Sequence, residues 1–234
     1  MTHAHGLALA LVGRMNEVAH PGRALPQGLA LLGVGHAAVA PVKVELERRT
    51  RRSVWSLQPH PRFGPEDDSY ELDARSRARG LDLVTITTPR ALRLNPLLTS
   101  LSPGVRLGPV VTWMILIDRR AAVLDGPRTP EGDPTAWIAT SGPFLEGAVE
   151  LWDATSAEST PALADGMPPP LGPRQLDVAR GVCLGRTDTT IARQLGISER
   201  TVARDVAAIL EVTGARSRAE AVLNMLGRGR HSRS

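Results

Sequence analysis

The four residues 195–198, Leu-Gly-Ile-Ser, constrain the fold more than any other part of the chain, because they separate two short amphipathic segments. Ile191 and Ala192 precede them at helical spacing. Glycine readily takes the left-handed conformation that a tight turn between helices needs, and serine is a preferred helix N-cap. The pattern predicts one helix over about 188–195, capped by Asp188, and a second helix over about 199–211.

The second of these helices has two different faces. Val202, Val206 and Ile209 recur at i, i+4 and i+7 and should point inward. Arginines and small residues fall on the opposite side, as in a helix that enters a DNA major groove, where arginine reads guanine. A helical bundle with a solvated arginine face is the alternative. The residues predicted to contact DNA are Arg193, Ser198, Arg200, Thr201, Ala203, Arg204 and Ala207, with Arg193 and Thr201 on phosphates.

The positive charge of the chain is concentrated at its C-terminal end. Residues 171–234 contain eleven arginines and six acidic residues, whereas the rest of the chain has nearly equal numbers of each. A basic region favours polyanions, because each neutralised phosphate releases counterions. Lys43 is the only lysine. The use of arginine, with abundant Ala, Gly and Pro, is typical of a GC-rich bacterial genome.

The run 191–202, Ile-Ala-Arg-Gln-Leu-Gly-Ile-Ser-Glu-Arg-Thr-Val, and the later run 214–221 closely resemble the LuxR-type (GerE-like) DNA-binding domain. Residues 171–175 resemble the opening segment of that family. The resemblance covers about 55 residues and implies that the helix after Ser198 reads DNA. It also implies that the last helix supports dimerisation on paired half-sites, for which we name Ser217, Ala221, Val222 and Met225.

The chain departs from the usual pattern of the family at a few positions. Gln175 stands where the family usually has Glu, Asp205 replaces a common His, and Val212-Thr213 replaces a common Lys-Leu. An acidic side chain beside Arg204 is expected either to weaken phosphate attraction or to orient an arginine. These changes affect the target sequence and the affinity, not the expected fold.

The residues before this domain predict an α/β domain over 38–153. Strands are expected at 53–57, 81–87, 110–117, 121–124 and 134–140, and helices at 41–51, 66–79 and 143–153. A Pro-rich linker (154–170) should join it to an all-α, four-helix domain (171–226), whose first helix spans 173–184. Residues 1–37 form a helical or irregular segment, and residues 227–234 a basic tail.

The α/β domain has three candidate roles. A phosphorylated receiver needs a late lysine and an acidic pair after its first strand, but Lys43 comes early and Asp67-Asp68 falls in a loop or at the start of a helix. A quorum-sensing lactone domain usually has more aromatic residues. The order of elements over 40–153 looks more like the phospholipase-D-like effector domain of TrmB-type regulators, without its His-x-Lys motif. This resemblance implies a sensory or dimerising domain without catalysis.

The remaining features favour a cytoplasmic regulator that is not an enzyme and needs no cofactor or metal. The chain lacks a phosphate-binding glycine loop and a nucleophile elbow, and Cys183 is its only cysteine. An α/β enzyme or interaction module with an accessory DNA-binding domain is the alternative. Asp118, Arg119 and Arg90 are polar candidates in the α/β domain. The expected partners are double-stranded DNA and a second copy of the chain, with RNA polymerase and a small-molecule effector as further candidates and no membrane.

Overall fold

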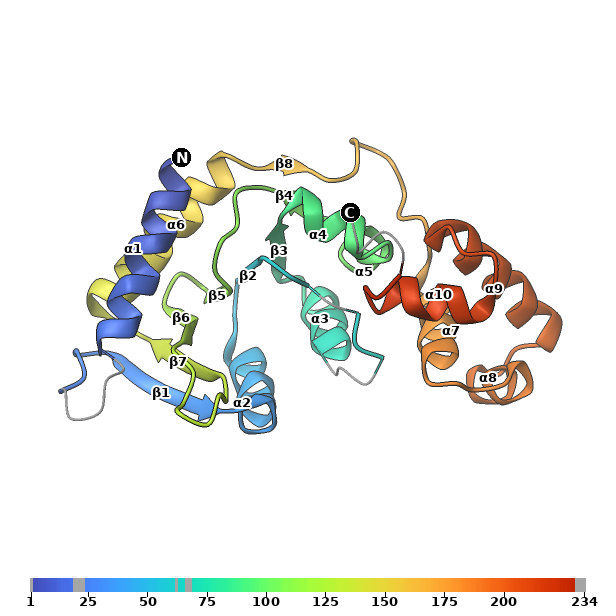
Figure 1. Cartoon of the computed structure of the whole chain (residues 1–234), viewed down its shortest axis with the longest axis horizontal. Helices are drawn as coiled ribbons and strands as arrows, with labels where there is room; N and C mark the ends of the chain where they lie inside the picture. The colour runs from blue at the N-terminus through green and yellow to red at the C-terminus, as the bar shows by residue number, and fades with distance from the viewer. Residues whose placement is uncertain (1, 19–23, 62, 66–68, 230–234) are drawn as a thin grey trace. The chain divides into compact units, whose positions relative to one another are not determined.

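The structure is a computed structural model that describes residues 2–18, 24–61, 63–65 and 69–229 (Figure 1). It divides into two compact units, each built from several stretches of the chain. The sheet domain comprises Met1–Pro59, Glu71–Thr88 and Arg106–Thr160. The helical domain comprises His60–Tyr70, Pro89–Val105 and Pro161–Ser234.

Eight strands form one mixed sheet over the described residues, in the order β1-β7-β6-β5-β2-β3-β4-β8. The pairs from β1 to β2 are antiparallel, whereas β2, β3 and β4 run parallel. The strands are β1 (Leu29–Val34), β2 (Ser53–Gln58), β3 (Asp82–Thr87), β4 (Arg106–Leu107), β5 (Met114–Ile117), β6 (Ala121–Gly126), β7 (Thr135–Ala139) and β8 (Thr160–Pro161).

Strand β5 shows how the sheet buries both of its faces. Met114 and Leu116 point into the main core, where helices α1 (His3–Val18) and α6 (Gly142–Ala157) cover the sheet. Ile115 and Ile117 point to the opposite face and pack in a smaller cluster with Leu46 of α2 (His36–Arg49). Alternate side chains of a strand lie on opposite faces, so an unbroken apolar run fits a strand covered on both sides.

Asp118 fixes the tight turn between β5 and β6. Asp118 and Arg119 have positive φ angles of 51° and 55°, and Arg120 N–H donates to the Ile117 carbonyl over 2.9 Å. Such a turn normally favours Asn or Gly at these positions. The Asp118 carboxylate offsets the strain, because it accepts hydrogen bonds of 2.8–2.9 Å from the backbone N–H groups of residues 51–53.

The helical domain contains the four predicted C-terminal helices and two further short ones. The predicted four are α7 (Pro173–Cys183), α8 (Asp188–Leu195), α9 (Glu199–Thr213) and α10 (Arg218–Met225). Helices α4 (Pro89–Leu94) and α5 (Leu98–Leu101) come from the connection between β3 and β4. Leu97 is fully buried in the same core as α7–α10, and the Leu171 N–H donates to Ser100 Oγ over 3.0 Å.

The predicted fold class, an α/β domain followed by an all-α region, is confirmed. Some elements differ in extent. Strand β5 begins at Met114 rather than at 110, and α6 continues to Ala157, inside the segment predicted as a linker. Residues 1–37, which the sequence left unplaced, contain α1 and β1. Of the predicted tail, residues 227–229 are described and 230–234 lie outside the described residues, as do Asp67 and Asp68.

Candidate nucleic-acid interface

The turn between α8 and α9 has the predicted geometry. Gly196 ends α8 in the left-handed conformation, with φ 65° and ψ 33°. Ser198 caps α9, since its hydroxyl accepts a hydrogen bond of 3.2 Å from the Thr201 N–H. The cap of α8 was predicted wrongly: Thr187 fills it by accepting from the Thr190 N–H, and Asp188 is the first helical residue.

Helix α8 is seated closely on α7 because α7 has a glycine at the contact. A Cβ atom at Gly181 would lie 2.7 Å from Cγ1 of Ile191, which is closer than the packing of real side chains allows. Ile191 is 1% exposed and belongs to the core of the helical domain. The glycine therefore permits the short distance between the first helix and the helix-turn-helix pair.

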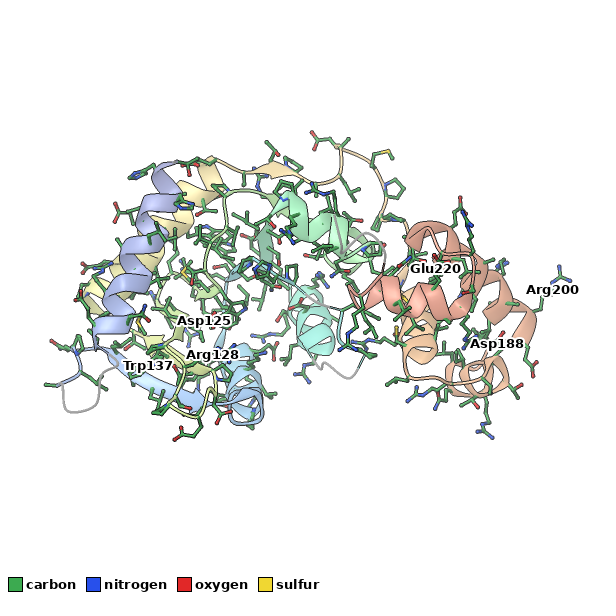
Figure 2. All side chains as sticks on the ribbon, in the orientation of Figure 1. Asp125, Arg128, Trp137, Asp188, Arg200 and Glu220 are labelled. Carbon is green, nitrogen blue, oxygen red and sulfur yellow. The ribbon has the colours of Figure 1, made fainter. Side chains whose placement is uncertain are left out.

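Helix α9 divides into an inner and an outer face. Val202 and Ile209 are fully buried, while Val206 packs at the edge of the core. On the outer face, Arg200, Ala203, Arg204 and Ala207 are all exposed. Figure 2 shows the Arg200 side chain extending away from the ribbon of α9. The predicted orientation of this helix within its own domain agrees with these exposures.

The arginines of the outer face are free to meet a ligand. Among the described residues, no side chain or backbone oxygen pairs with the guanidinium groups of Arg193, Arg200 or Arg204. By contrast, Arg186 of the same region donates to Gln194 Oε1 over 2.9 Å. Thr201 is half-buried, and its hydroxyl lies 2.9 Å from that of Ser198. An exposed helix with unpaired guanidinium groups beside small residues can approach a base-pair edge closely.

Asp205 does not lie beside the arginines of the outer face. Its side chain is 1% exposed, and its two oxygens accept from Nε and Nη2 of Arg174 over 2.8 and 3.1 Å. The hydrogen bonds and the negative charge of Asp205 raise the pKa of Arg174. Of the two expected effects of Asp205, the contacts show the second: it orients an arginine, which is Arg174 of α7 rather than Arg204. The sequence indicated that Asp205 is buried, because it follows Val202 by three residues and therefore lies on the same, inner face of the helix.

Helix α10 meets the rest of the domain through its first turn. Ser217 caps it by accepting from the Glu220 N–H over 3.2 Å. Arg218 forms an ion pair with Asp188 at the start of α8 and also donates to the Arg186 carbonyl. These contacts hold the two helix starts together.

Only part of the predicted dimerisation set is accessible. Ala221 and Met225 are each 1% exposed and pack in the core of their own domain, so neither side chain is available to a partner. Ser217 is exposed and Val222 is half-buried. Leu223, which is 48% exposed on the same helix, was not among the predicted residues. The pattern of apolar residues does not predict this exposure, because it does not distinguish Leu223 from its neighbour Val222.

Of the three polar candidates, Asp118 and Arg119 have structural roles in the sheet domain, whereas Arg90 belongs to the helical domain. Asp118 holds the β5–β6 turn; partial burial opposes its ionisation, but the backbone donors of residues 51–53 and the charge of Arg120 outweigh burial and lower its pKa. Arg119 forms a double hydrogen bond with Asp153, at 2.6 and 2.7 Å, and its guanidinium lies over the ring of Trp55. Arg90 is exposed on α4.

Other chemistry receives little support from the described residues. Within them, no three His, Cys, Asp or Glu side chains gather as a metal site would require. Burial raises the pKa of the Cys183 thiol to about 11, which suits a core residue. None of the helices in the described ranges is long and apolar enough to span a membrane.

The sequence of the helix-turn-helix region decides its family. Residues 169–225 match the GerE family, described as bacterial regulatory proteins of the luxR family. These residues are a luxR-family helix-turn-helix domain. They include the whole of α7 to α10, so the match and the helical arrangement describe the same unit. The match covers this helical region and none of the sheet domain.

Several solved structures resemble this chain in part, with low TM-scores. The phospholipase D family member Nuc from Salmonella typhimurium is 13% identical, with a TM-score of 0.44 over 58% of this chain and 99% of that one. TrmBL2, an archaeal chromatin protein, is 12% identical, with a TM-score of 0.43 over 68% and 62%. The VqmA–ligand–DNA complex of Vibrio cholerae is 24% identical, with a TM-score of 0.25 over 50% and 49%.

These neighbours include the kinds of protein that the sequence resembles, but TM-scores below 0.5 are too low to assign an activity to the sheet domain. Among curated proteins, no sequence matches the chain.

Proposed function

We propose that the chain is a sequence-specific transcription regulator in which α9 of the luxR-family domain enters the DNA major groove. The observation that carries the proposal is the pair of exposed, unpartnered guanidinium groups of Arg200 and Arg204 on a helix that is rigidly seated by its other face. A guanidinium can form two hydrogen bonds to guanine O6 and N7. Ala203 and Ala207 leave room between the helix and the base edges.

Phosphate contacts are proposed for Arg193 and for Thr201, which lie on α8 and in the first turn of α9. Such contacts fix the position and tilt of the recognition helix without reading sequence. Ser198 contributes by holding the first turn of α9 in place, and its hydroxyl is near the same surface.

The chain is further proposed to act as a homodimer on two half-sites. Within the luxR-family domain, the exposed Leu223 of α10 supports this, because an exposed leucine can be buried against a second copy of the chain. The sheet domain is proposed to bind a small effector or to add to the dimer contact. Contact with RNA polymerase and a cytoplasmic location belong to the same proposal.

Selection from a pool of random DNA duplexes with the full chain tests the proposal. We expect an enriched motif that contains guanines and, for a dimer, two related halves at a fixed spacing. Failure to enrich any sequence, at low as well as moderate salt, would reject sequence-specific binding and favour an enzyme or an interaction module. Light scattering measures the mass of the chain alone and bound to the selected duplex, and this mass tests the proposed homodimer.

A separate experiment addresses the sheet domain. Metabolite pools are screened for an increase in the Tm of the full chain, since a ligand that binds the folded state raises its stability. A ligand-dependent shift supports an effector site. A chain that is dimeric, shows no shift, and becomes monomeric when the sheet domain is deleted would instead support a purely dimerising role.

A further inference from the structure

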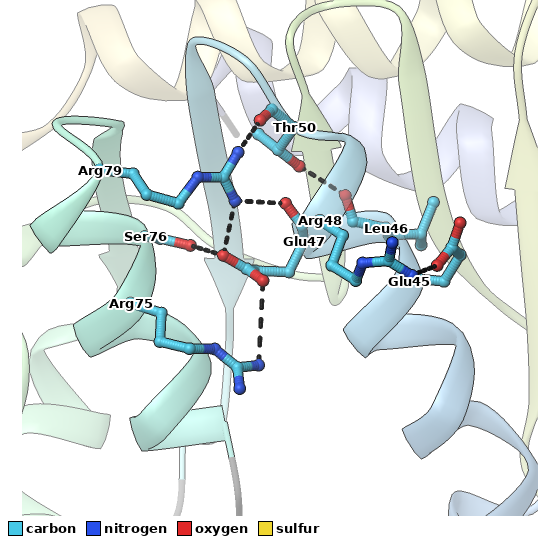
Figure 3. A network of polar contacts seen from close by, with 8 residues as sticks. All are labelled: Glu45, Leu46, Glu47, Arg48, Thr50, Arg75, Ser76 and Arg79. Atoms are coloured by element: carbon cyan, nitrogen blue, oxygen red, sulfur yellow. Dashed lines mark hydrogen bonds and ion pairs between the residues drawn. The ribbon is translucent and has the colours of Figure 1, made fainter.

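An arginine-rich surface lies on the sheet domain, where the C-terminal ends of α2 and α3 (Ser69–Ala78) meet the loop before β2 (Figure 3). The arginine surface is defined by six exposed residues: Arg48, Arg49, Arg51, Arg52, Arg75 and Arg79. It includes an open groove of about 450 Å³ lined by Val44, Glu47 and three of these arginines. Without these six arginines, residues 1–170 have 11 basic and 18 acidic side chains, so the surplus of positive charge is confined to this surface.

Two glutamates organise four of the arginines. Glu47 is 9% exposed and accepts from Arg79 Nη1 over 2.8 Å and from Ser76 Oγ over 3.2 Å, with Arg75 Nη2 at 3.8 Å. Arg79 also donates to the carbonyls of Glu47 and Thr50, which ties α3 to the end of α2. Glu45 is shared by Arg48 and Arg49. Each carboxylate therefore serves two guanidinium groups, which fixes their positions and neutralises only half of their charge.

Arg51 and Arg52 have no such partner. Their backbone N–H groups donate to Asp118, but within the described structure their guanidinium groups make no hydrogen bond or ion pair. A favourable interaction with the helix dipole explains arginines in the last turn of α2. It does not explain this pair, because α2 ends at Arg49 and Thr50 is already extended, with φ −66° and ψ 135°. Asp82 begins β3, and its carboxylate accepts a hydrogen bond from the Trp55 indole N–H. Together with Glu45, Glu47 and Asp118, it makes four carboxylates at this surface against six guanidinium groups.

We propose that the arginine surface is a second DNA-contact site, which binds phosphate groups of the duplex that α9 reads. The inference rests on the proposed function. Phosphate is the ligand that suits this chemistry, because guanidinium groups bind it through two parallel hydrogen bonds and lose little hydration in doing so. DNA is favoured over other polyanions because the luxR-family domain of the same chain holds it at a high effective concentration.

The test compares two double variants of the full chain with the wild type. Arg51→Gln/Arg52→Gln removes the two unpartnered guanidinium groups and keeps the backbone contacts to Asp118. The control, Arg14→Gln/Arg128→Gln, removes the same charge from exposed positions of the sheet domain outside the arginine surface. Figure 2 shows Arg128 in the region of the β6–β7 hairpin. Equal Tm values establish that all three proteins are folded.

Affinity for the selected duplex is measured by fluorescence anisotropy over a range of salt concentrations. Each lost phosphate contact reduces the magnitude of the slope of log K against log salt by about 0.9. The Arg51/Arg52 variant should therefore lose about 1.8 units of slope, which at 0.1 M salt corresponds to a loss of about 60-fold in affinity relative to 1 M salt. The preferred sequence should not change.

The possible results separate this inference from the proposed function. If the Arg51/Arg52 variant and the control had the same salt slope and the same affinity, the second DNA-contact site would be overturned, and an acidic protein partner would be the better candidate ligand for this surface. A wild type that binds no duplex would instead reject the proposed function itself.

Discussion

Arg174, at the start of α7, forms two hydrogen bonds to the buried carboxylate of Asp205, in the middle of α9. The pair joins the first helix of the luxR-family domain to the helix proposed to read DNA. Asp205 is 1% exposed, whereas the Arg174 side chain is 49% exposed. The carboxylate is therefore the partner that depends on the contact, because a buried charge without a partner is costly.

Replacement of Arg174 by methionine should destabilise the helical domain. Removal of the guanidinium leaves the Asp205 carboxylate buried and unpaired, so we expect a fall of several degrees in Tm by calorimetry. The double variant Arg174→Met/Asp205→Leu should recover much of the loss, because it removes both charges. The matched control is Arg216→Met, an exposed arginine of the same domain. A single variant as stable as this control would contradict the role of the pair.

Arg204→Ala should weaken binding to the selected DNA and relax its sequence preference. Loss of a bidentate guanine contact costs about 1–3 kcal/mol of binding free energy at one base pair. Arg193→Ala, at a proposed phosphate contact, should weaken binding to all sequences alike. It should also reduce the magnitude of the slope of log K against log salt by about 0.9. Competition titrations with single-base variants of the site separate the two effects. If the two variants gave the same profile, the proposed orientation of α9 on DNA would be wrong.

Ser198→Ala should lower the free energy of unfolding of the helical domain by about 1 kcal/mol, since the Thr201 N–H loses its acceptor. Ser198→Asp should retain the cap, because its carboxylate accepts from the same group and suits the positive end of the helix dipole. Urea unfolding followed by circular dichroism measures both variants. An alanine variant that unfolds at the same urea concentration as the wild type would show that the cap contributes nothing.

Asp118→Asn should make the stability of the sheet domain depend less on pH in the acidic range. Because the pKa of Asp118 is lower in the folded state than in the unfolded state, the ionised form contributes stability that is complete above the unfolded value of about 3.8. This contribution disappears as the pH falls through the lower, folded value. The variant should be less stable than the wild type at pH 7, and the difference should shrink below about pH 4. Tm measured across this range tests the sign, and a constant difference would contradict it.

Cys183 should react slowly with thiol reagents in the folded protein. Its pKa is raised to about 11 by burial, so little of the reactive thiolate is present at pH 7.5. Mass spectrometry after treatment with iodoacetamide should show an unmodified native chain and complete modification in denaturant. Rapid labelling of the native chain would show that the start of the α7–α8 turn opens readily.

The parts of the site that the sequence predicted correctly depend on neighbours in the chain. The left-handed conformation of Gly196 and the cap at Ser198 are set by residues within one helical turn. The buried positions Val202 and Ile209 follow from the helical period. Local rules of this kind do not require knowledge of the rest of the fold.

The parts that it missed depend on contacts between distant segments. Ala221 and Met225 were expected on a dimer surface, but α10 turns these side chains into the core beside α7 and α9. Leu97 could not be placed either, because its burial depends on helices that lie more than 70 residues further along the chain. The start of β5 was missed because apolar residues continue from Val110 to Ile117, and such a run does not mark where pairing with β6 begins.

The burial of Leu97 and Phe63 among α7–α10 limits how this DNA-binding module can be transplanted. A chimaera that takes only the stretch matched by its family would carry a core with one wall missing, and the exposed leucine and valine side chains would favour aggregation. Any engineered fusion therefore has to include the segments that carry Phe63 and Leu97. The folded unit is larger than the stretch that its family match marks in the sequence.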